Sequence, residues 1–455
     1  MARLTILNYS EYNALYKIPE FTFEERLEAF ALDSKDKEII DGFDEIALKI
    51  NYVLQLGYFK VVQYFFNFTF QQVREDVWYI INTHFQNAKF SKKNLSSYQH
   101  YRVQECIRKK YSVSKSSTNY LNRLKSTIEF ICKNDTTSKF LFESILCFAQ
   151  QNNVIRPPYS TCQEIISTVL KNERRRLSSI VGSRLDIKFR KQIDNLLEKE
   201  SSLYSLTMLK KDPKDFSTSE IKKEVNKHSI LLDLYLQAQN IIPQLGISDN
   251  NIKFYSDLIE YYTIAKLKRN SQKNLIRLYL LCFIFNRFKQ INENLIQSYV
   301  YRVSKYNTDS DEYQQQQIYE EKFSIDDNKE KAGRILNLYM DDKIPDEMLR
   351  VRAFEIIQKS KFKNFVRKVV KPVFDKNKYI WRYHQDNART FKLNLRPIFN
   401  VVDFSCKNPE LEKAVTFLKK VFSSGKDTGN LNYKELPIDF FPKSLRRYYF
   451  EKRLV

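Results

Sequence analysis

The chain has 455 residues and a formal net charge of +22 at pH 7, because 76 Lys and Arg outnumber 54 Asp and Glu. Apolar residues make up 43% of it, which excludes a disordered chain and is enough for about three domains. The surplus of positive charge excludes basic surfaces as partners and favours polyanions, nucleic acid first and anionic membrane second. Codon usage in an A/T-rich genome raises the Lys content by itself, but it does not lower the Asp and Glu content. The imbalance therefore favours nucleic-acid binding.

The periodicity of the chain predicts helices rather than strands. It contains only 7 Gly, too few for the many tight turns of an all-β fold. Residues 161–164 have the spacing of a capping box, and apolar residues then recur at helical intervals from 165 to 177. This pattern predicts one helix over residues 164–181. We expect Gly182 to interrupt the chain and the next helix to begin at Ser183.

The second half of the sequence adds helices and one candidate strand. Residues 275–288 are apolar nearly all round, which predicts a helix at the centre of a helical domain. Pro345 with two acids directly after it predicts another helix start. Between residues 391 and 395 apolar and polar residues alternate before Pro397, which predicts a strand. The expected fold is mainly α, made of several helical bundles, with at most a small β element near residues 391–404.

Changes in composition divide the chain into five expected segments. Residues 309–342 are rich in acids and contain a Gln run, and their first part is interpreted as a linker between two unequal parts. The expected segments are a helical DNA-binding module (1–88), a second such module (89–153), a helical domain with a basic face and an apolar core helix (154–305), an acidic, Gln-rich linker with the start of the next helix (306–345), and a basic helical region (346–455).

No pattern in the sequence predicts a catalytic centre. The histidines lie far apart and outside metal-binding motifs. Residues 423–427, SSGKD, lack both the upstream Gly and the Ser or Thr after the Lys that a phosphate-binding loop needs, so they are interpreted as a turn. We therefore expect no enzyme activity, no metal site and no cofactor. The cysteines have no paired spacing and are interpreted as small buried hydrophobes in a reducing compartment; they are Cys106, Cys132, Cys147, Cys162, Cys282 and Cys406.

The sequence carries no signal for export or membrane insertion. Residues 1–12 lack the apolar core of a signal peptide. The most apolar run, residues 278–285, is far shorter than the roughly 20 residues of a membrane-spanning helix. We expect a cytoplasmic, nucleoid-associated bacterial protein that does not contact membrane.

Basic residues cluster in residues 172–192. Arg174, Arg175 and Arg176 fall in the last turns of the helix predicted to end at residue 181, where the helix dipole favours cations. This structural interpretation accounts for part of the cluster without a ligand. In the next predicted helix three cations align on one side, about one turn apart, and that pattern fits both a run of phosphates and an ordinary solvated face. The aligned residues are Arg184, Lys188 and Lys191.

Two further clusters extend the candidate DNA-binding surface. Residues 101–115 combine cations with hydroxyl groups that also donate to phosphate, and residues 359–396 interleave cations with aromatic side chains that suggest stacking on bases or sugars. Aromatic residues make up 14% of the chain, and at that frequency they more often belong to a hydrophobic core than to a nucleic-acid-binding surface. The predicted DNA contacts are Arg102, Arg108, Lys109, Lys110, Lys115, Arg174, Arg175, Arg184, Lys188, Lys191, Lys363, Arg367 and Lys371.

Four stretches resemble one known family. LTILNYSEYNALYKIPE, residues 4–20, resembles the opening of the Tn-three family of replicative, cointegrate-forming transposases. IALKINYVLQLGYFKVVQYFF, residues 46–66, resembles the LGFALQLCYLRYPGRFL segment of that family, and VIRPPYSTCQE, residues 154–164, is similar to its IVxPGxTxLE. LPIDFFPKSLRRY, residues 436–448, resembles its FVPKRWRRY. The stretches follow the order of the family and span almost the whole chain.

The chain departs from the family in one motif and in length. Ile107 and Arg108 match the family's R-x-x-H-x-x-x-I-R-x-x-x-G element, but Val103 and Ser112 stand where it has His and Gly. Family members are about twice as long, with an RNase H-like catalytic domain after the point where Val455 ends this sequence. The resemblance therefore implies helical modules that recognise terminal inverted repeats, without the domain that cuts and joins strands; Mg²⁺ would belong to that absent domain.

We therefore expect a sequence-specific binder of transposon terminal inverted-repeat DNA, acting as the non-catalytic N-terminal half of a transposase. The expected partner is double-stranded DNA, with a homodimer or a partner transposase as a further possibility. The alternative is an interaction protein that regulates a full-length transposase by dimerising with it, or a truncated remnant of one. An unrelated enzyme whose active site forms only in three dimensions is the least favoured hypothesis, since no catalytic motif is present.

Overall fold

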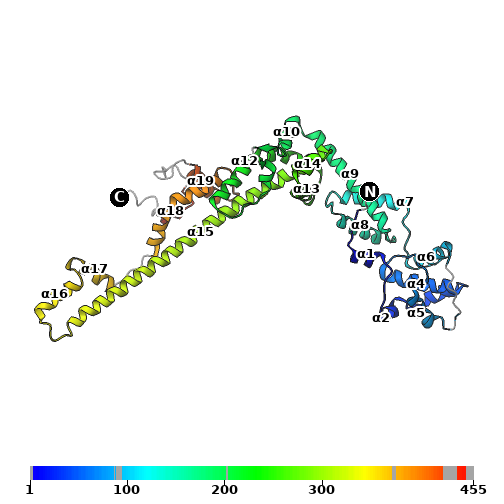
Figure 1. Ribbon diagram of the computed structural model, residues 1–455, viewed down its shortest axis with the longest axis horizontal. Coiled ribbons are helices and arrows are strands. Elements are labelled where there is room, and N and C mark those ends of the chain that lie inside the picture. Colours follow the sequence, from blue (N-terminus) through cyan, green and yellow to red (C-terminus); the bar gives the residue numbers. More distant parts are fainter. Residues whose placement is uncertain are drawn as a thin grey trace. The chain divides into compact units, whose positions relative to one another are not determined.

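A computed structural model describes residues 4–86, 88, 95–200, 203–370, 376–423 and 438–446, which are largely helical (Figure 1). The prediction of a mainly α fold is confirmed. The strands within these residues, Lys199–Glu200 (β1) and Leu203–Tyr204 (β2), form one short antiparallel pair. The helices of the first half are α1 (Tyr9–Tyr16), α2 (Phe23–Ala29), α3 (Ser34–Asp41), α4 (Ile46–Val62), α5 (Arg74–His84), α6 (Ser97–Tyr111), α7 (Thr118–Ile131), α8 (Ser138–Gln151), α9 (Tyr159–Arg184), α10 (Ile187–Asn195) and α11 (Ser205–Lys210).

The second half continues with α12 (Thr218–Ile241), the 3-10 helix η1 (Ile242–Leu245), α13 (Asp249–Tyr261), α14 (Ile264–Arg269), α15 (Lys273–Leu338), α16 (Asp346–Ile356), α17 (Lys359–Val370), α18 (Lys376–Phe399), α19 (Pro409–Ser423) and α20 (Lys443–Arg446). The chain forms two compact units. The first consists of residues 1–197 and 237–286, and the second of residues 198–236 and 287–455.

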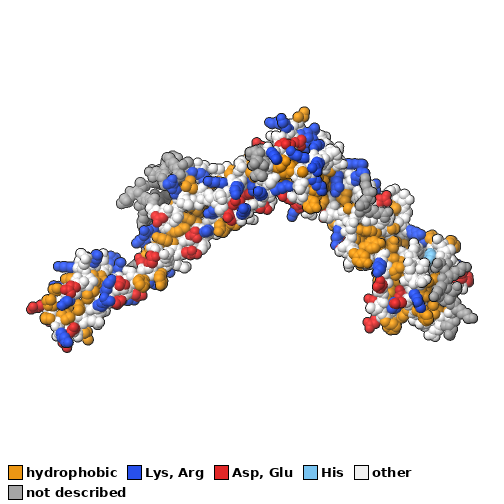
Figure 2. All heavy atoms as spheres, viewed as in Figure 1, with side chains coloured by type: hydrophobic (Ala, Val, Ile, Leu, Met, Phe, Trp, Pro, Cys, Tyr) orange, Lys and Arg blue, Asp and Glu red, His pale blue; other side chains and the backbone are white. Residues whose placement is uncertain are grey.

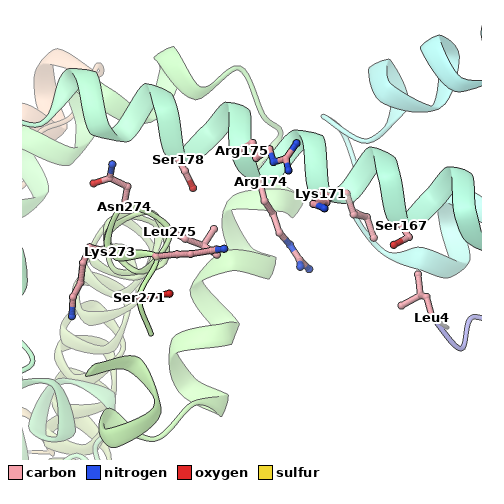
Figure 3. A pocket seen from close by; sticks show the side chains of 12 residues that line it. Leu4, Ser167, Lys171, Arg174, Arg175, Ser178, Ser271, Lys273, Asn274 and Leu275 are labelled. Carbon is pink, nitrogen blue, oxygen red and sulfur yellow. The ribbon is translucent and has the colours of Figure 1, made fainter. Parts of the chain in front are cut away.

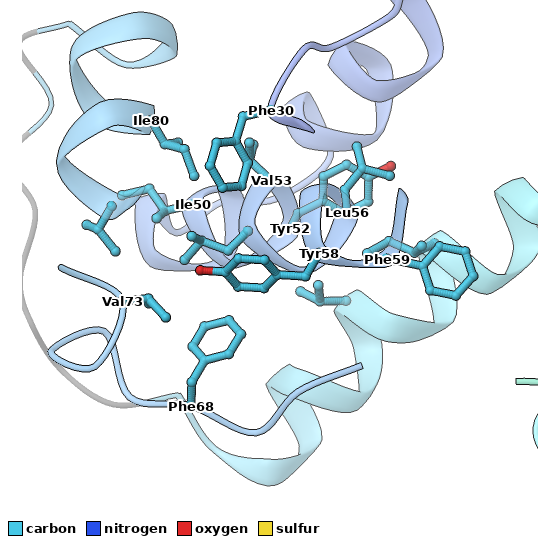
Figure 4. Close-up of a cluster of buried hydrophobic side chains, with 14 of the residues drawn as sticks. Phe30, Ile50, Tyr52, Val53, Leu56, Tyr58, Phe59, Phe68, Val73 and Ile80 are labelled. Carbon is cyan, nitrogen blue, oxygen red and sulfur yellow. The ribbon is translucent and has the colours of Figure 1, made fainter. Parts of the chain in front are cut away.

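Helix α4 lies at the centre of the first hydrophobic core of the first unit (Figure 4). It is apolar nearly all round, and Tyr52 and Tyr58 are completely buried. Helices α2, α3, α5 and α6 pack against it. The buried hydroxyl of Tyr58 donates to a carboxylate oxygen of Asp76 at 2.7 Å, and Arg26 donates to the other oxygen at 2.7 Å. These hydrogen bonds limit the cost of burying the Tyr58 hydroxyl, whereas both polar atoms of the buried Asn51 amide and the amide oxygen of Gln55 on the same helix have no hydrogen-bond partner among the described residues.

Helices α7, α8 and α9 form a bundle around a second core. Leu124 and Ile128 of α7, Ile145 of α8, and Ile166 and Val169 of α9 are completely buried there. Each helix contributes residues three or four apart, so one side of each faces the core and the other remains exposed. This bundle fixes the direction of α9.

Arg156, immediately before α9, joins the two cores. Its guanidinium donates to the backbone oxygen of Leu15 at 2.9 Å and to that of Val62, at the end of α4. It also lies over the ring of Tyr16, 5.4 Å from the centroid. The pKa of Arg156 is lowered by burial, an effect opposed by its neighbours Tyr16 and Cys162. The hydrogen bonds to two helix ends offset that cost of desolvation.

The predicted bounds of α9 were wrong at both ends. The helix begins at Tyr159 with Pro158 as its N-cap, so no capping box forms at residues 161–164. It also continues through Gly182 to Arg184. A Cβ atom at residue 182 would lie 2.6 Å from the side-chain nitrogen of Asn274, at the start of α15, so the Asn274 amide would have to move to accommodate any other residue. A close approach, and not a turn, explains this residue.

Two predictions in the second unit were also wrong. Residues 309–338 belong to α15 and form no linker. Ion pairs one turn apart support this helix, with 2.5 Å between Lys331 and Asp327 and 2.7 Å between Arg334 and Glu330. Residues 391–399 form the end of α18 and not a strand.

Aromatic contacts join α15 and α18 in the second unit. Tyr306 of α15 stacks on Phe391 of α18, with ring centroids 4.2 Å apart, and also contacts Tyr383 at 5.5 Å. A smaller core near the end of α15 contains Ile335 and Phe365. The division into five segments otherwise stays a prediction.

We predict that Gly57→Ala lowers the free energy of unfolding of the first unit by about 1 to 3 kcal/mol. A Cβ atom at residue 57 of α4 would lie 2.4 Å from the buried ring of Phe30 and 3.1 Å from the backbone oxygen of Ala29. Urea unfolding, followed by the fluorescence of Trp78 in a Trp381→Phe background, measures this change.

The matched control is Gly42→Ala in the same unit, where the nearest atom to a new Cβ is 3.4 Å away. We expect it to leave the unfolding midpoint within experimental error or to raise it. An equal loss in both variants would contradict the close packing described at Gly57.

Candidate nucleic-acid interface

A basic groove lies between α9 and the chain around the start of α15, within the first unit (Figure 3). Helix α9 turns Val169, Glu173 and Leu177 toward the interior, so the residues on its other side are displayed. The groove has a volume of about 790 Å³. It is lined by Leu4, Ser167, Leu170, Lys171, Arg174, Arg175, Ser178, Ser271, Gln272, Lys273, Asn274 and Leu275.

The charge of the basic groove is uniformly positive. Lys171, Arg174 and Arg175 are exposed, and none of them makes a hydrogen bond or an ion pair with another described residue. Lys273 donates to the backbone oxygen of Lys268 at 3.2 Å and keeps its charge unpaired by any carboxylate. No lining residue is acidic, and the remaining polar ones are Ser, Gln and Asn. Cations among neutral hydrogen-bond donors are the groups that contact phosphates in protein–DNA complexes.

Arg176 differs from its two neighbours. Its guanidinium makes two hydrogen bonds, at 2.6 and 2.8 Å, to the buried carboxylate of Glu173. It also donates to the backbone oxygen of Leu245 at 2.8 Å. The bonds to Glu173 raise the pKa of Arg176 despite its partial burial. All three arginines lie in the middle of α9, so the sequence-based explanation by the end of the helix dipole was wrong.

The predicted stripe of three cations is divided between two helices. Arg184 is the last residue of α9, and Lys188 and Lys191 lie on α10. Asp186 caps α10 by accepting from the backbone nitrogen of Phe189 at 2.6 Å. The three cationic side chains are exposed, and Figure 2 shows Lys and Arg side chains gathered where α9 and α10 lie.

The cluster on α6 contains cations with different surroundings. Arg108 and Lys115 both lie over the half-exposed ring of Tyr101, 5.4 and 4.5 Å from its centroid. Arg102 lies 5.4 Å from the ring centroid of Phe43, and Lys109 pairs with Glu105 at 3.4 Å. Arg102, Lys109 and Lys115 are exposed, while Arg108 is half-buried.

Lys110 is a structural residue and not a free cation. Its ammonium contacts Asp33 at 2.7 Å and the completely buried Asp36 at 2.6 Å. The hydroxyl of Tyr52 donates to the same oxygen of Asp36 at 3.0 Å. The hydrogen bond from Lys110 is the main reason why the pKa of Asp33 falls from 3.8 to about 2. Its predicted role in contacting DNA is therefore not supported by its surroundings.

The candidate residues near the C-terminus lie in the second unit. Lys363 and Arg367 are exposed on α17, whose apolar side holds the buried Phe365. Lys371 lies outside the described residues. Among the interleaved aromatic side chains of α18, Tyr379 is buried at 6% exposed and Tyr383 contacts α15, whereas Trp381 is exposed.

Sequence reasoning missed two residues of the basic groove. Lys171 could have been found, since it precedes Arg174 by three residues and Arg175 by four and therefore shares their side of the helix. Lys273 could not, because it reaches the groove only through the packing of α15 beside α9.

Other chemistry is sparse in the described part of the chain. No group of His, Cys, Asp and Glu there could hold a metal ion. The cysteines are free; Cys132, Cys162 and Cys282 are buried as expected, but Cys147 is exposed. Among the same residues, no helix combines the length and the apolar character that crossing a membrane requires.

Comparison with protein families gives a match over the first part of the chain. Residues 6–169 match a family described as a domain of unknown function, DUF4158, which is found in transposase-like proteins. The match covers α1 to α8 and the beginning of α9, so it includes the α6 cluster and ends just before Lys171. No curated protein matches the chain.

We predict that Lys110→Gln lowers the free energy of unfolding of the first unit by about 1 to 3 kcal/mol at pH 7, because the buried carboxylate of Asp36 loses a charged partner. The pKa of Asp33 is lowered in the folded protein, so its stabilising pair is intact above about pH 4 and is lost as the pH falls through about 2. The difference between wild type and variant should therefore narrow from pH 5 to pH 3 in urea unfolding experiments.

The folded variant should bind DNA like wild type in the cold, where it stays folded. If Lys110→Gln lost much of its DNA affinity without losing stability, Lys110 would be a DNA contact and not a structural residue.

Proposed function

We propose that the chain binds double-stranded DNA sequence-specifically, at transposon terminal inverted repeats, as the non-catalytic N-terminal half of a transposase. The observation that carries this proposal is the basic groove, where four cations face one cavity that no acidic side chain lines. The match of residues 6–169 to a domain found in transposase-like proteins supports the same function. The proposal assigns DNA binding to this chain and no chemical step.

The composition of the groove favours a phosphate backbone over other anions. Arg174 and Arg175 offer planar guanidinium groups that donate two parallel hydrogen bonds to one phosphate, and Lys171 and Lys273 add point charges. The Ser, Asn and Gln side chains between them donate neutral hydrogen bonds to phosphate and sugar oxygens. A long regular polyanion uses all of these donors at once.

Further cations of the first unit extend the surface beyond the groove. They are exposed on α6, on α10 and in the segments next to them, and comprise Arg102, Lys109, Lys115, Arg184, Lys188 and Lys191. Each phosphate that such a cation neutralises releases counterions from DNA, so the affinity depends on salt concentration.

We predict that the triple variant Lys171→Glu, Arg174→Glu and Arg175→Glu weakens binding to every duplex. The slope of log affinity against log salt concentration should become shallower by about 2 to 3 units, because three phosphate contacts are lost. Fluorescence anisotropy with a labelled duplex at several salt concentrations measures both quantities.

The matched control is Lys329→Glu, Lys331→Glu and Arg334→Glu on α15. It changes the net charge by the same amount, on a helix segment rich in acids. We expect it to affect binding much less. Equal losses of DNA affinity in the two triple variants would show that only the net charge of the protein matters. Unchanged binding by the groove variant would contradict the proposal.

A further inference from the structure

Helix α7 displays one uncovered side, which we call the α7 stripe. It consists of Asn119, Asn122, Arg123, Ser126 and Phe130, spaced at 0, 3, 4, 7 and 11 residues from the first. All five are exposed, and Phe130 is 68% exposed. The opposite side of the same helix anchors it in the second core. Its anchoring residues are Tyr120, Leu124 and Ile128, of which the last two are completely buried.

The side chains of the α7 stripe have hydrogen-bonding capacity left over. The guanidinium of Arg123 and the amides of Asn119 and Asn122 make no hydrogen bond or ion pair with another described residue. The hydroxyl of Ser126 donates to the backbone oxygen of Asn122 at 3.1 Å and can still accept. These polar groups therefore face an external partner or water.

The composition of the stripe is costly for an ordinary solvated helix. Asn and Ser favour helix less than the Glu, Lys and Gln that usually cover such a surface, so the helix gives up local stability at three positions. An exposed Phe at the end of the stripe adds apolar surface that water disfavours. A partner that uses amides, a guanidinium and one apolar ring explains all five residues together.

Electrostatics beside the stripe favour an anionic partner. The acid of α7 is Glu129, which lies at the border of the stripe and accepts a hydrogen bond from the amide of Asn172 on α9 at 3.3 Å. The exposed Lys115 lies just before the helix, followed by Ser116, Ser117 and Thr118. Ser117 caps the helix by accepting from the backbone nitrogen of Tyr120 at 3.2 Å. Cations and hydroxyls at a helix start are suited to phosphates that flank a groove.

Resting on the DNA binding proposed above, we propose that α7 enters the major groove of the duplex and that Asn122 and Arg123 read base edges. An Arg fork pairs with the O6 and N7 atoms of guanine, an Asn amide pairs with the N6 and N7 atoms of adenine, and an exposed ring contacts the methyl group of thymine. The helix rises about 16 Å from Asn119 to Phe130. That length spans roughly five base pairs, at 3.4 Å for each.

The α7 stripe and the basic groove are separate surfaces. On α9, Asn172 and Arg176 face a small cleft of about 390 Å³ that Ser126 and Phe130 also line. Lys171, Arg174 and Arg175 leave α9 on its other side, in the basic groove. Substitutions in one surface therefore leave the contacts of the other in place, and their effects should be close to additive.

The test uses the full chain and a pool of duplexes with a randomised segment. Duplexes are selected from the pool in repeated rounds of binding to each of three proteins, and the bound duplexes are sequenced. The proteins are wild type, the double variant Asn122→Ala and Arg123→Ala, and a control. The control is Arg334→Ala and Asn337→Ala, an exposed pair three residues apart on α15. Circular dichroism and thermal unfolding establish that the variants are folded, as expected for exposed positions.

We expect wild type and control to select one motif. The α7 variant should lose its preference at one to three base pairs within about five consecutive ones. Discrimination there should fall roughly 5- to 100-fold, while binding to unrelated duplexes stays within a few-fold of wild type.

Each other outcome contradicts a specific part of these proposals. Selection of an unchanged motif by the α7 variant would overturn base reading by α7 and leave the proposed DNA binding intact. Salt-dependent binding of wild type without any motif would overturn both base reading by α7 and the sequence specificity of the proposed function, and would leave only non-specific DNA binding. Absence of binding to every duplex, with the variants folded, would overturn the proposed function itself.

Discussion

The first unit depends on the half-buried guanidinium of Arg156. Its guanidinium donates hydrogen bonds to backbone oxygens at the ends of α1 and α4, and it lies over the ring of Tyr16. These contacts join the core around α4 to the bundle of α7, α8 and α9. A hydrophobic contact could slide, but a planar fork with fixed donor directions sets one geometry. Arg156 lies three residues before α9, whose direction is fixed by its packing against α7 and α8 in the second core. The positions of the cations on α9 follow from that packing.

Much of the fold could be predicted from residue periodicity, and its failures have physical causes. Phe391, Leu395 and Ile398 are spaced at helical intervals, yet the alternation over residues 391–395 satisfies a strand pattern equally well. The packing of Phe391 on Tyr306 decides between them, and no local rule contains that contact. The acidic segment after residue 309 was interpreted as a linker because its composition is polar. Ion pairs one helical turn apart make the same composition compatible with a continuous helix.

The candidate interface was predictable as a region and less so as a set of residues. Basic clusters in the sequence identify α6, α9 and α10 correctly as carriers of exposed cations. They do not reveal that Lys110 is held by Asp33 and Asp36, because those partners lie more than 70 residues away in the chain. They also overlook α7, whose stripe contains a single cation. A search for charge finds surfaces that hold a phosphate backbone, whereas groups that distinguish bases are mostly neutral amides and hydroxyls.

Gly182 of α9 lies close to Asn274, an uncharged residue that lines the basic groove. Its missing side chain lets Asn274, whose amide oxygen accepts from Arg277 at 3.1 Å, come up against α9 and bring Lys273 with it. A side chain at residue 182 would meet the end of the Asn274 amide, which would have to move, while the four cations of the groove are unchanged. A substitution at residue 182 therefore changes the position of one uncharged residue that lines the groove, Asn274, without altering the net charge of the protein.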